Sequence, residues 1–389
     1  MTKEKSTVPR LRFPGFTDAW KQRKLGEVVD VCSGRDYKHL EAGSVPVYGT
    51  GGYMLSVSEA LSENVDAIGI GRKGTIDNPY ILKAPFWTVD TLFYCLPKQG
   101  SILEFSYTIF QNINWRSMDE STGVPSLSKV RINNIKVLTP SLQEQEVIGS
   151  FFSDLDQLIT LHQRKLDDVK ELKKALLQKM FPKGNGNDFP ELRFPEFTDA
   201  WKQRKLGEVS KRVTRRNKEL ISSLPLTISA QHGLVDQEEF FNKQVASKDV
   251  SSYYLIKKGE FAYNKSYSNG YPWGAIKRLD RYEMGVLSTL YIVFKPTSLI
   301  CSDYLVSYYD TVNWYKEVSM IAAEGARNHG LLNIAPNDFF KTRLFIPTLP
   351  EQEAIGSFFS DLDQLITLHQ HQLDHLKLLK KALLQQMFI

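Results

Sequence analysis

The chain of 389 residues contains only three cysteines, Cys32, Cys95 and Cys301, which lie far apart and form no Cys-x-x-Cys pair. That spacing supports neither a disulfide framework nor a cysteine-based zinc site. Its apolar runs are only a few residues long, too short to span a membrane, and no charged-then-apolar leader precedes them. These absences predict a protein of the reducing cytoplasm.

Motifs for catalysis are missing as well. No Walker A sequence occurs, so the chain does not encode ATP-driven work. Gly69–Gly74 fits G-x-G-x-x-G, but an Asn-Pro pair follows where a helix should begin, and we expect a turn there. Asn78–Tyr80 is similar to the Asn-Pro-Pro-Tyr/Phe motif of amino-methyltransferases, but it lacks the second proline and no glycine-rich methyl-donor loop accompanies it. We therefore predict a chain without catalytic residues.

What the sequence does contain is two pairs of repeats. Leu11–Val28 and Leu192–Val209 differ at a single position, and Gly149–Gln163 recurs unchanged as Gly356–Gln370. The stretches that follow the first pair share almost no sequence with each other. A constant–variable–constant order that occurs twice predicts two copies of one partner and two different targets.

The two variable stretches differ in charge. Val29–Thr139 has 10 basic and 11 acidic residues, whereas Ser210–Ile346 has 18 basic and 13 acidic residues. A basic surface is typical of nucleic-acid binding, so the charge favours that function more for the second stretch. Short β-branched and aromatic runs at Asp90–Leu96 and Leu290–Lys295 predict strands, and glycine-rich Tyr48–Tyr53 predicts a tight turn. Each variable stretch is therefore expected to be mixed α/β.

The second constant segment of each half predicts a helix of about 40 residues, because its apolar residues advance by threes and fours. In the first copy Ser141 and Glu144 have the spacing of a capping box, and in the second copy Pro350 falls in the first turn. So long an apolar seam needs a partner, and we predict that the two helices pair as an antiparallel coiled coil. The alternative is that each helix packs only on its own module.

Antiparallel pairing would relate the two halves by an approximate two-fold axis and place the variable modules at opposite ends of a spacer. The regular seam includes Leu172 and Leu379, and the residues predicted to pair the helices or dock a partner are Phe152, Leu155, Ile159, Leu166, Phe359, Leu362, Ile366 and Leu373.

Histidines on these helices are not expected to bind metal. His371 and His375 lie four residues apart, but the first copy has Arg164 and Asp168 at the equivalent positions, which indicates a solvated face. His162 and His369 fall in the predicted seam, where we expect interfacial histidines with satisfied hydrogen bonds.

Polar, basic and aromatic clusters in the variable stretches are the candidates for DNA contacts, since arginine and lysine can pair with guanine and amides with adenine in the major groove. In the first variable stretch they are Arg35, Lys38, Thr50, Tyr53, Arg72, Lys73, Thr75, Asn78, Tyr80, Arg116, Ser126, Ser128 and Lys129. In the second they are Arg212, Arg215, Arg216, Asn217, Gln231, His232, Asn264, Lys265, Tyr267, Asn269, Tyr271, Arg327, Asn328 and His329.

This layout resembles the specificity subunit of Type I restriction–modification systems. The matching marks are a W-x4-L-G-E-V entry to each module, at Trp20–Val28 and Trp201–Val209, and the exits PSLQEQEVI at Pro140–Ile148 and PTLPEQEAI at Pro347–Ile355. The four motifs occur in this order over essentially the whole chain, with diverged modules between them.

The resemblance implies a bacterial, non-catalytic protein in which each variable stretch is a target recognition domain for one half of a bipartite, asymmetric double-stranded DNA site. It implies that the helices set the gap and dock two modification (methyltransferase) subunits, which would carry S-adenosylmethionine and methylate adenine. Separate restriction subunits would use ATP and Mg²⁺. This chain itself would hold no cofactor and no metal. A coiled-coil scaffold that binds no DNA is the other reading of the repeats.

The expected division is a loose tail (1–10), recognition domain 1 (11–139), spacer helix 1 (140–182), a linker (183–191), recognition domain 2 (192–346) and spacer helix 2 (347–389).

Overall fold

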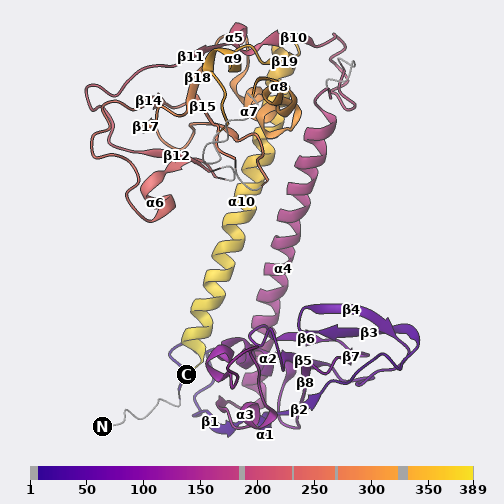
Figure 1. The fold of residues 1–389 in the computed structure, drawn as a ribbon. Coiled ribbons are helices and arrows are strands. Elements are labelled where there is room, and N and C mark those ends of the chain that lie inside the picture. The colour runs from indigo at the N-terminus through magenta and orange to yellow at the C-terminus, as the bar shows by residue number, and fades with distance from the viewer. Residues whose placement is uncertain (1–7, 184–188, 230–231, 268–269, 323–331, 389) are drawn as a thin grey trace. The chain divides into compact units, whose positions relative to one another are not determined.

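Two long helices are the largest elements of the structure: α4 (Leu142–Lys179) and α10 (Leu349–Met387) (Figure 1). They contain 38 and 39 residues, and at about 1.5 Å per residue each is roughly 57 Å long. Both lie within the segments for which the sequence predicts a helix of about 40 residues.

The protein is described by a computed structural model over residues 8–183, 189–229, 232–267, 270–322 and 332–388. It divides into two compact units. Unit 1 combines residues 1–165 with residues 369–389, and unit 2 comprises residues 166–368. The boundary cuts both long helices, because each unit contains the beginning of one helix and the end of the other.

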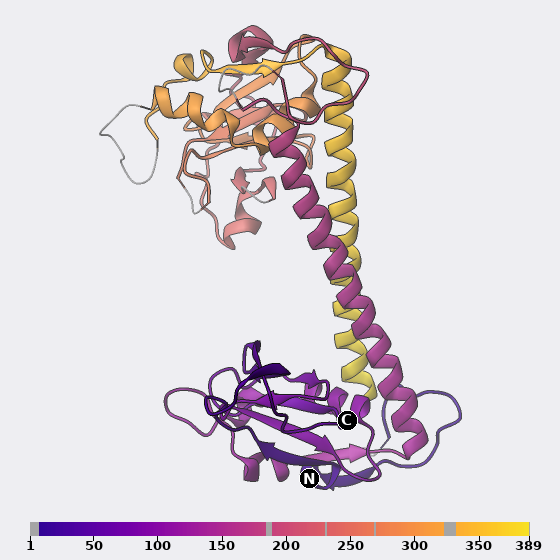
Figure 2. The same ribbon diagram turned by 90° about the vertical axis from the view of Figure 1, so that its right-hand side faces the viewer.

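In unit 1 the start of α4 packs antiparallel to the end of α10. Asp156 accepts a hydrogen bond from Lys380 Nζ at 2.5 Å, and the rings of Phe152 and Phe388 lie 6.2 Å apart. In unit 2 the end of α4 packs against the start of α10 (Figure 2). The rings of Phe181 and Phe359 lie 6.1 Å apart there. The predicted antiparallel pairing is confirmed within each unit, and packing of each helix only on its own module is wrong.

Part of the predicted seam is wrong. Leu172 and Leu379 are 50% and 40% exposed, and the neighbouring Lys173 and Lys380 turn inward instead. Lys173 Nζ lies 2.7 Å from Asp363 Oδ1, which mirrors the pairing of Lys380 described above. An ammonium group can take a seam position because a carboxylate of the facing helix compensates its charge.

The seam histidines are interfacial but not satisfied as expected. His162 and His369 both lie in unit 1 with ring centroids 5.9 Å apart. The buried Nδ1 atom of each ring has no hydrogen-bond partner among the described residues. Two rings that face each other across a seam exclude the polar groups that would otherwise reach these nitrogens.

The capping box of α4 forms only in part. Ser141 Oγ accepts a hydrogen bond from Glu144 N at 3.4 Å, as the box requires. The Glu144 carboxylate does not reach back to the cap, because Arg12 and Trp20 occupy it. Pro350 lies in the first turn of α10, as predicted.

The first module is built on a four-stranded antiparallel sheet of order β2-β8-β5-β6. A second sheet has the order β4-β3-β7, and β1 pairs with β9. Apart from α4 and α10, the elements of unit 1 are β1 (Lys21–Lys24), α1 (Leu25–Val28), β2 (Val29–Ser33), β3 (Ala42–Gly49), β4 (Gly52–Val57), β5 (Ala67–Gly71), β6 (Tyr80–Leu82), β7 (Trp87–Thr88), β8 (Leu92–Pro97), α2 (Leu103–Asn112), the 3-10 helix η1 (Trp115–Met118), α3 (Lys129–Asn133) and β9 (Lys136–Thr139).

The second module has a sheet of the same order, β11-β18-β15-β16. The pairs β12-β13, β14-β17 and β10-β19 complete it (Figure 1). Its elements are β10 (Lys202–Lys205), α5 (Leu206–Val209), β11 (Ser210–Arg212), β12 (Leu226–Ser229), β13 (Gly233–Asp236), α6 (Gln237–Phe241), β14 (Tyr254–Lys257), β15 (Phe261–Asn264), β16 (Ala275–Arg278), β17 (Met284–Leu287), β18 (Ile292–Pro296), α7 (Ser302–Asp310), α8 (Asn313–Ile321), α9 (Pro336–Phe339) and β19 (Arg343–Ile346).

The two modules therefore share a scaffold although their sequences diverge. In each, a buried tryptophan follows the helix that packs on the long helices. Trp115 Nε1 donates to the carbonyl of Phe110 at 2.8 Å, and Trp314 Nε1 donates to that of Tyr309 at 3.1 Å. The strands predicted at 90–96 and 290–295 are confirmed as β8 and β18, and each is the second strand in the order of its four-stranded sheet. The predicted mixed α/β class is confirmed.

Candidate nucleic-acid interface

A loop cluster in the first module gathers six of the predicted DNA contacts. The loop between β5 and β6 is tied to the segment that precedes α3, because Gly74 N donates to Pro125 O at 2.8 Å and Leu127 N donates to Arg72 O at 2.9 Å. The Arg116 guanidinium group also bonds Asp77 of that loop at 2.5 Å. The predicted residues that these contacts bring together are Arg72, Lys73, Thr75, Asn78, Arg116 and Ser126.

The turn between β3 and β4 presents Thr50 and Tyr53. Tyr48 pairs with Tyr53 across a tight turn, as the glycine-rich run predicts, and Tyr53 is 63% exposed. Tyr80 has another role, since its hydroxyl donates to Gly49 O at 2.6 Å and burial raises its pKa. Tyr80 therefore fastens the turn to the sheet, and this contact occupies its hydroxyl proton.

The other first-module candidates lie outside the loop cluster. Ser128 Oγ accepts a hydrogen bond from Arg131 N and caps α3, so its side chain has a structural role. Lys129 begins that short helix. Arg35 and Lys38 are exposed in the segment after β2, where the Arg35 carbonyl accepts from Trp87 Nε1 at 2.9 Å.

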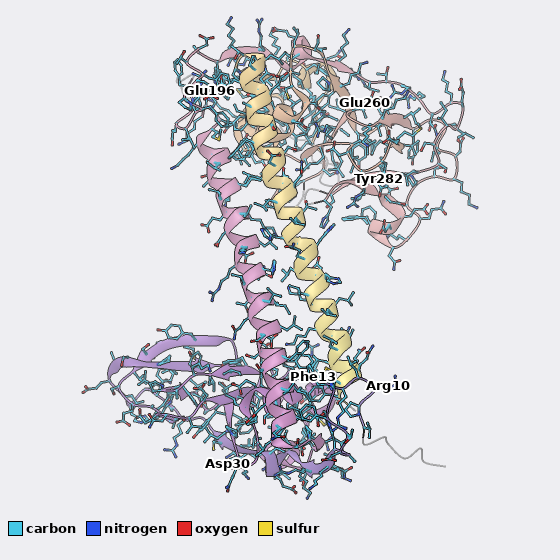
Figure 3. All side chains as sticks on the ribbon, turned by 180° about the vertical axis from the view of Figure 1, so that it is seen from behind. Arg10, Phe13, Asp30, Glu196, Glu260 and Tyr282 are labelled. Carbon is cyan, nitrogen blue, oxygen red and sulfur yellow. The ribbon has the colours of Figure 1, made fainter. Side chains whose placement is uncertain are left out.

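Three predicted contacts of the second module bind other parts of the protein instead of facing solvent freely. Asn217 is fully buried, and its side chain bonds both the carbonyl and the amide of Ser222, so the prediction that it contacts DNA is wrong. Arg215 donates a hydrogen bond of 2.7 Å to Glu260, the residue labelled in Figure 3, and Arg216 lies over the ring of Tyr254. A basic run can hold its own loop as readily as it can bind phosphate, and the sequence does not distinguish the two.

The loop after β15 carries the most accessible aromatic candidate of this module. Tyr267 is 58% exposed. Asn264 Oδ1 accepts from Ser266 N at 3.0 Å, and Lys265 Nζ donates to Ile334 O at 3.3 Å, with burial lowering the pKa of Lys265. Tyr271 is half-buried, while Arg212 on β11 and His232 are exposed. Gln231, Asn269, Arg327, Asn328 and His329 lie outside the described residues.

The constant segments form a buried carboxylate site in each unit. Glu144 is 1% exposed and receives two hydrogen bonds of 2.7 Å from Arg12 and one of 3.3 Å from Trp20. Glu351 is fully buried and receives the matching bonds from Arg193 and Trp201. These contacts fasten each entry segment to the first turn of a long helix.

The entry segments also cap the far end of the helix that reaches each unit. Leu11 N donates to Gln386 O at 3.1 Å, and Leu192 N donates to Lys179 O at 3.0 Å. Phe13 (Figure 3) packs its ring on Phe151 at 5.5 Å. The repeat of the entry segment thus reflects two equivalent helix ends that both need their terminal carbonyls satisfied.

The variable modules are seated on the helices through their backbone. Gln145 Oε1 accepts from Ile102 N at 3.2 Å, just before α2, and Gln352 Oε1 accepts from Cys301 N at 2.9 Å, just before α7. One turn further along each long helix, Gly149 and Gly356 allow the module helix to approach closely. Because constant residues contact backbone atoms of the variable modules, different sequences can occupy the same seat.

A substitution tests this seat. In Gly149→Ala the new methyl group would lie 2.7 Å from Phe105 N, so α2 must move. We expect a loss of about 1–3 kcal/mol in unfolding free energy, as for other overpacked sites, although alanine gains about 1 kcal/mol in helix propensity. Urea unfolding measures the balance, and exposed Ser150→Ala is the control. Stabilisation by Gly149→Ala would show that the close approach does not limit packing.

The residues predicted to pair the helices or dock a partner lie mainly in the buried seam. Phe152, Phe359, Leu166 and Leu373 are at most 1% exposed, and Leu155 is 8% exposed. Ile159, Leu362 and Ile366 are half-buried. The seam assignment therefore stands, but fully buried side chains cannot dock a partner. The outward-facing leucines of the identical segment are Leu158, Leu161, Leu365 and Leu368, which are 38–52% exposed.

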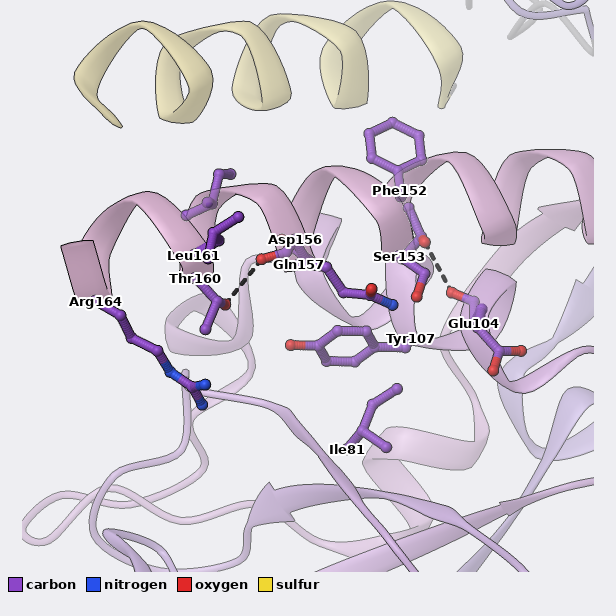
Figure 4. Close-up of a pocket in the computed structure, with 12 residues that line it drawn as sticks. Ile81, Glu104, Tyr107, Phe152, Ser153, Asp156, Gln157, Thr160, Leu161 and Arg164 are labelled. Atoms are coloured by element: carbon purple, nitrogen blue, oxygen red, sulfur yellow. Dashed lines mark hydrogen bonds between the residues drawn. The ribbon is translucent and has the colours of Figure 1, made fainter. Parts of the chain in front are cut away.

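A hollow of about 560 Å³ lies in unit 1 between α2 and α4 (Figure 4). Tyr107 extends into it and donates from its hydroxyl to Pro79 O at 3.4 Å, which links the hollow to the loop cluster. Its charged lining consists of Arg164, Glu104 and Asp156. Two carboxylates beside one guanidinium group do not favour phosphate binding.

No group of three or more metal-ligating side chains occurs among the residues that the structure describes. His371 and His375 are both exposed, which agrees with a solvated face. Over the same part of the chain, no helix is long and apolar enough to cross a membrane.

Sequence reasoning missed a group of lysines in unit 2. Lys170, Lys173 and Lys174 of α4 line a pocket together with Lys277 of β16 and aromatic residues of the second module. The signal was present in the sequence, because lysines recur in the second copy at 377, 380 and 381.

Comparison with known proteins places these features in a class. The family described as "Type I restriction modification DNA specificity domain" matches residues 17–171. The MjaVIII Type I restriction enzyme specificity subunit of Methanocaldococcus jannaschii is 29% identical over 151 residues, which is 38% of this chain and 33% of that protein. The putative MjaX specificity subunit of the same organism is 28% identical over 101 residues, covering 25% of this chain and 23% of that one. The matched part of this chain thus spans about a third or less of the length of each of these curated relatives.

The fold is shared over a much longer stretch. The crystal structure of the Type I restriction–modification S subunit from M. genitalium superposes with a TM-score of 0.67 at 13% identity, covering 98% of this chain and 99% of that one. The chain therefore shares the fold of that S subunit. Residues 17–171 match the model of the Type I restriction modification DNA specificity domain family, and the resemblance drawn from the sequence motifs is confirmed.

Proposed function

We propose that this chain is the DNA-specificity subunit of a Type I restriction–modification complex and that each module reads one half of a bipartite, asymmetric site. The observation that carries the proposal is the combination of two modules with one scaffold, different loops and an identical backbone seat. Such a design changes the surface that meets the target while it keeps the rest of the assembly constant. The family match of the first module supports the same conclusion.

The constant helices dock two copies of a methyltransferase subunit in this proposal. The outward-facing leucines of the identical segments offer the same apolar surface twice, at Leu158 with Leu161 and at Leu365 with Leu368. The methyltransferase subunits bind S-adenosylmethionine, and the restriction subunits use ATP and Mg²⁺. This chain selects the site, and the chemistry belongs to its partners.

Methylome sequencing tests the proposal. A host that carries this chain with matching modification subunits should show a methylated-adenine motif of two unlike half-sites, and a host that lacks only this chain should not. No chain-dependent motif, despite confirmed expression and assembly, would favour the scaffold without DNA binding.

Two matched variants assign the half-sites. Tyr53→Ala and Tyr267→Ala each remove an exposed aromatic ring, one from each module. We expect each to weaken recognition by about 1–3 kcal/mol, roughly 5- to 150-fold, and to relax one half-site of the methylated motif only. Equal relaxation of both half-sites by either variant would contradict the modular reading.

A further inference from the structure

The lysine pocket of unit 2 lies where α4 meets the second recognition module. Lys170, Lys173 and Lys174 contribute one wall, and β16 with the loop before it contributes the opposite wall through Tyr271 and Lys277. The end of α7 and the start of α8 close it with Asp310 and Tyr315. The cavity has a volume of about 270 Å³ and is open to solvent on one side.

The floor of the pocket is electrically balanced. Asp310 receives hydrogen bonds of 2.8 Å from both Lys173 and Lys277, and Lys173 also bonds Asp363 at 2.7 Å. Burial raises the pKa of Asp310, but the two ammonium groups outweigh it and hold that pKa below its ordinary value. Two ammonium groups thus face two carboxylates, and the floor carries no net charge that could attract a charged ligand.

The rim of the pocket, in contrast, carries unbalanced positive charge. Lys170 and Lys174 are exposed, and neither is in an ion pair with any residue that the structure describes. The side chains of Tyr271 and Tyr315 lie beside them, with hydroxyl groups that can donate hydrogen bonds. Two free ammonium groups next to two phenols are suited to an anion that extends along the surface.

The same lysines are present in both halves of the chain. Lys170 and Lys174 recur as Lys377 and Lys381, in a segment (164–181 against 371–388) in which 6 of 18 positions differ. Two other exposed lysines of α4, Lys165 and Lys179, correspond to glutamines in the second copy. The lysines that line the pocket are therefore the ones that the two copies share.

What occupies this rim must touch a recognition module and a constant helix together. Residues common to both copies cannot distinguish two unlike half-sites, so they suit a feature that every half-site has. The phosphate backbone of DNA is such a feature, because phosphate contacts position a protein on the duplex without reading its sequence.

We propose that Lys170 and Lys174, with Tyr271 and Tyr315, form a phosphate-binding site for the DNA strand that flanks the half-site read by the second module. This inference rests on the proposed function and adds to it a role for the spacer helix. The helix does not only connect the modules: it contacts the DNA backbone independently of sequence.

The test measures binding of the full chain to a 30-base-pair duplex of arbitrary sequence across a series of salt concentrations. Each phosphate that a lysine neutralises contributes about 0.9 to the slope of log K against log salt. Lys170→Gln with Lys174→Gln should therefore reduce that slope by about 2 and weaken binding at low salt by roughly 10-fold or more. The matched control is Lys165→Gln with Lys179→Gln, which makes the same charge change on the same helix with the residues that the second copy has.

The possible outcomes separate the two proposals. Equal slopes for the pocket variant and the control would overturn the phosphate site while the proposed function remains. Failure of the unchanged chain to bind any duplex, alone or with modification subunits, would contradict the proposed function itself. If the pocket variant keeps its slope but loses assembly with the modification subunits, a protein partner occupies the rim and the inference is wrong. Unchanged urea midpoints in both variants establish that folding is not the cause.

Discussion

Phe152→Asp is expected to abolish the folded state of unit 1. Phe152 is fully buried and packs between its neighbour Phe151 and Phe388 from the end of α10. Removal of a buried phenylalanine side chain costs about 3–5 kcal/mol, and a carboxylate placed there has no cation to compensate it. Since domains are stable by only about 5–15 kcal/mol, the sum of the two effects consumes most of this margin.

Circular dichroism, urea unfolding and gel filtration measure this loss. The matched control is Leu158→Asp, which introduces the same charge on the same helix at a side chain that is 40% exposed. This control should unfold at the urea concentration of the unchanged chain and lose only its assembly with modification subunits. The variant Phe359→Asp should repeat the result in unit 2, where Phe359 contacts Phe181. A Phe152→Asp chain that unfolds cooperatively at the normal urea concentration would refute the seam.

Glu351→Gln is expected to have the second largest effect. The Glu351 carboxylate is fully buried and receives two hydrogen bonds of 2.7 Å from the Arg193 guanidinium group. Replacement by an amide leaves that guanidinium group, 13% exposed, without its counter-charge. Loss of one member of a buried ion pair costs about 3–5 kcal/mol.

Denaturant unfolding provides the measurement, and Glu353→Gln provides the control because Glu353 is exposed two residues further along the same repeated motif. The control should change stability by less than about 0.5 kcal/mol. Addition of Arg193→Met to Glu351→Gln should recover part of the loss, since the buried charge is then removed as well. Equal effects of the two glutamine substitutions would show that the motif does not depend on the buried pair.

The contacts of individual loop residues are harder to predict from the sequence than the helices, for a physical reason. A helix seam repeats every few residues and is visible in the sequence, whereas a loop residue is directed by contacts from distant segments. Asn217 illustrates this: its amide bonds Ser222 and is buried, although its sequence neighbours are basic. Lys173 illustrates the reverse, because it turns into the seam in place of the predicted Leu172 and there bonds Asp310 and Asp363.

The sequence by itself determined the two repeats, the two long helices and their mutual pairing, and it carried the motifs of the family. Periodicity and repetition are local properties, so they can be read without coordinates. Only the tertiary structure showed that modules with almost no common sequence share one sheet order. It also showed that each long helix holds its module through a glutamine side chain that bonds a backbone N–H group of the module. A hydrogen bond to a backbone N–H group does not depend on the side chain of that residue. The variable sequences could therefore diverge while the modules kept the same attachment to the helices.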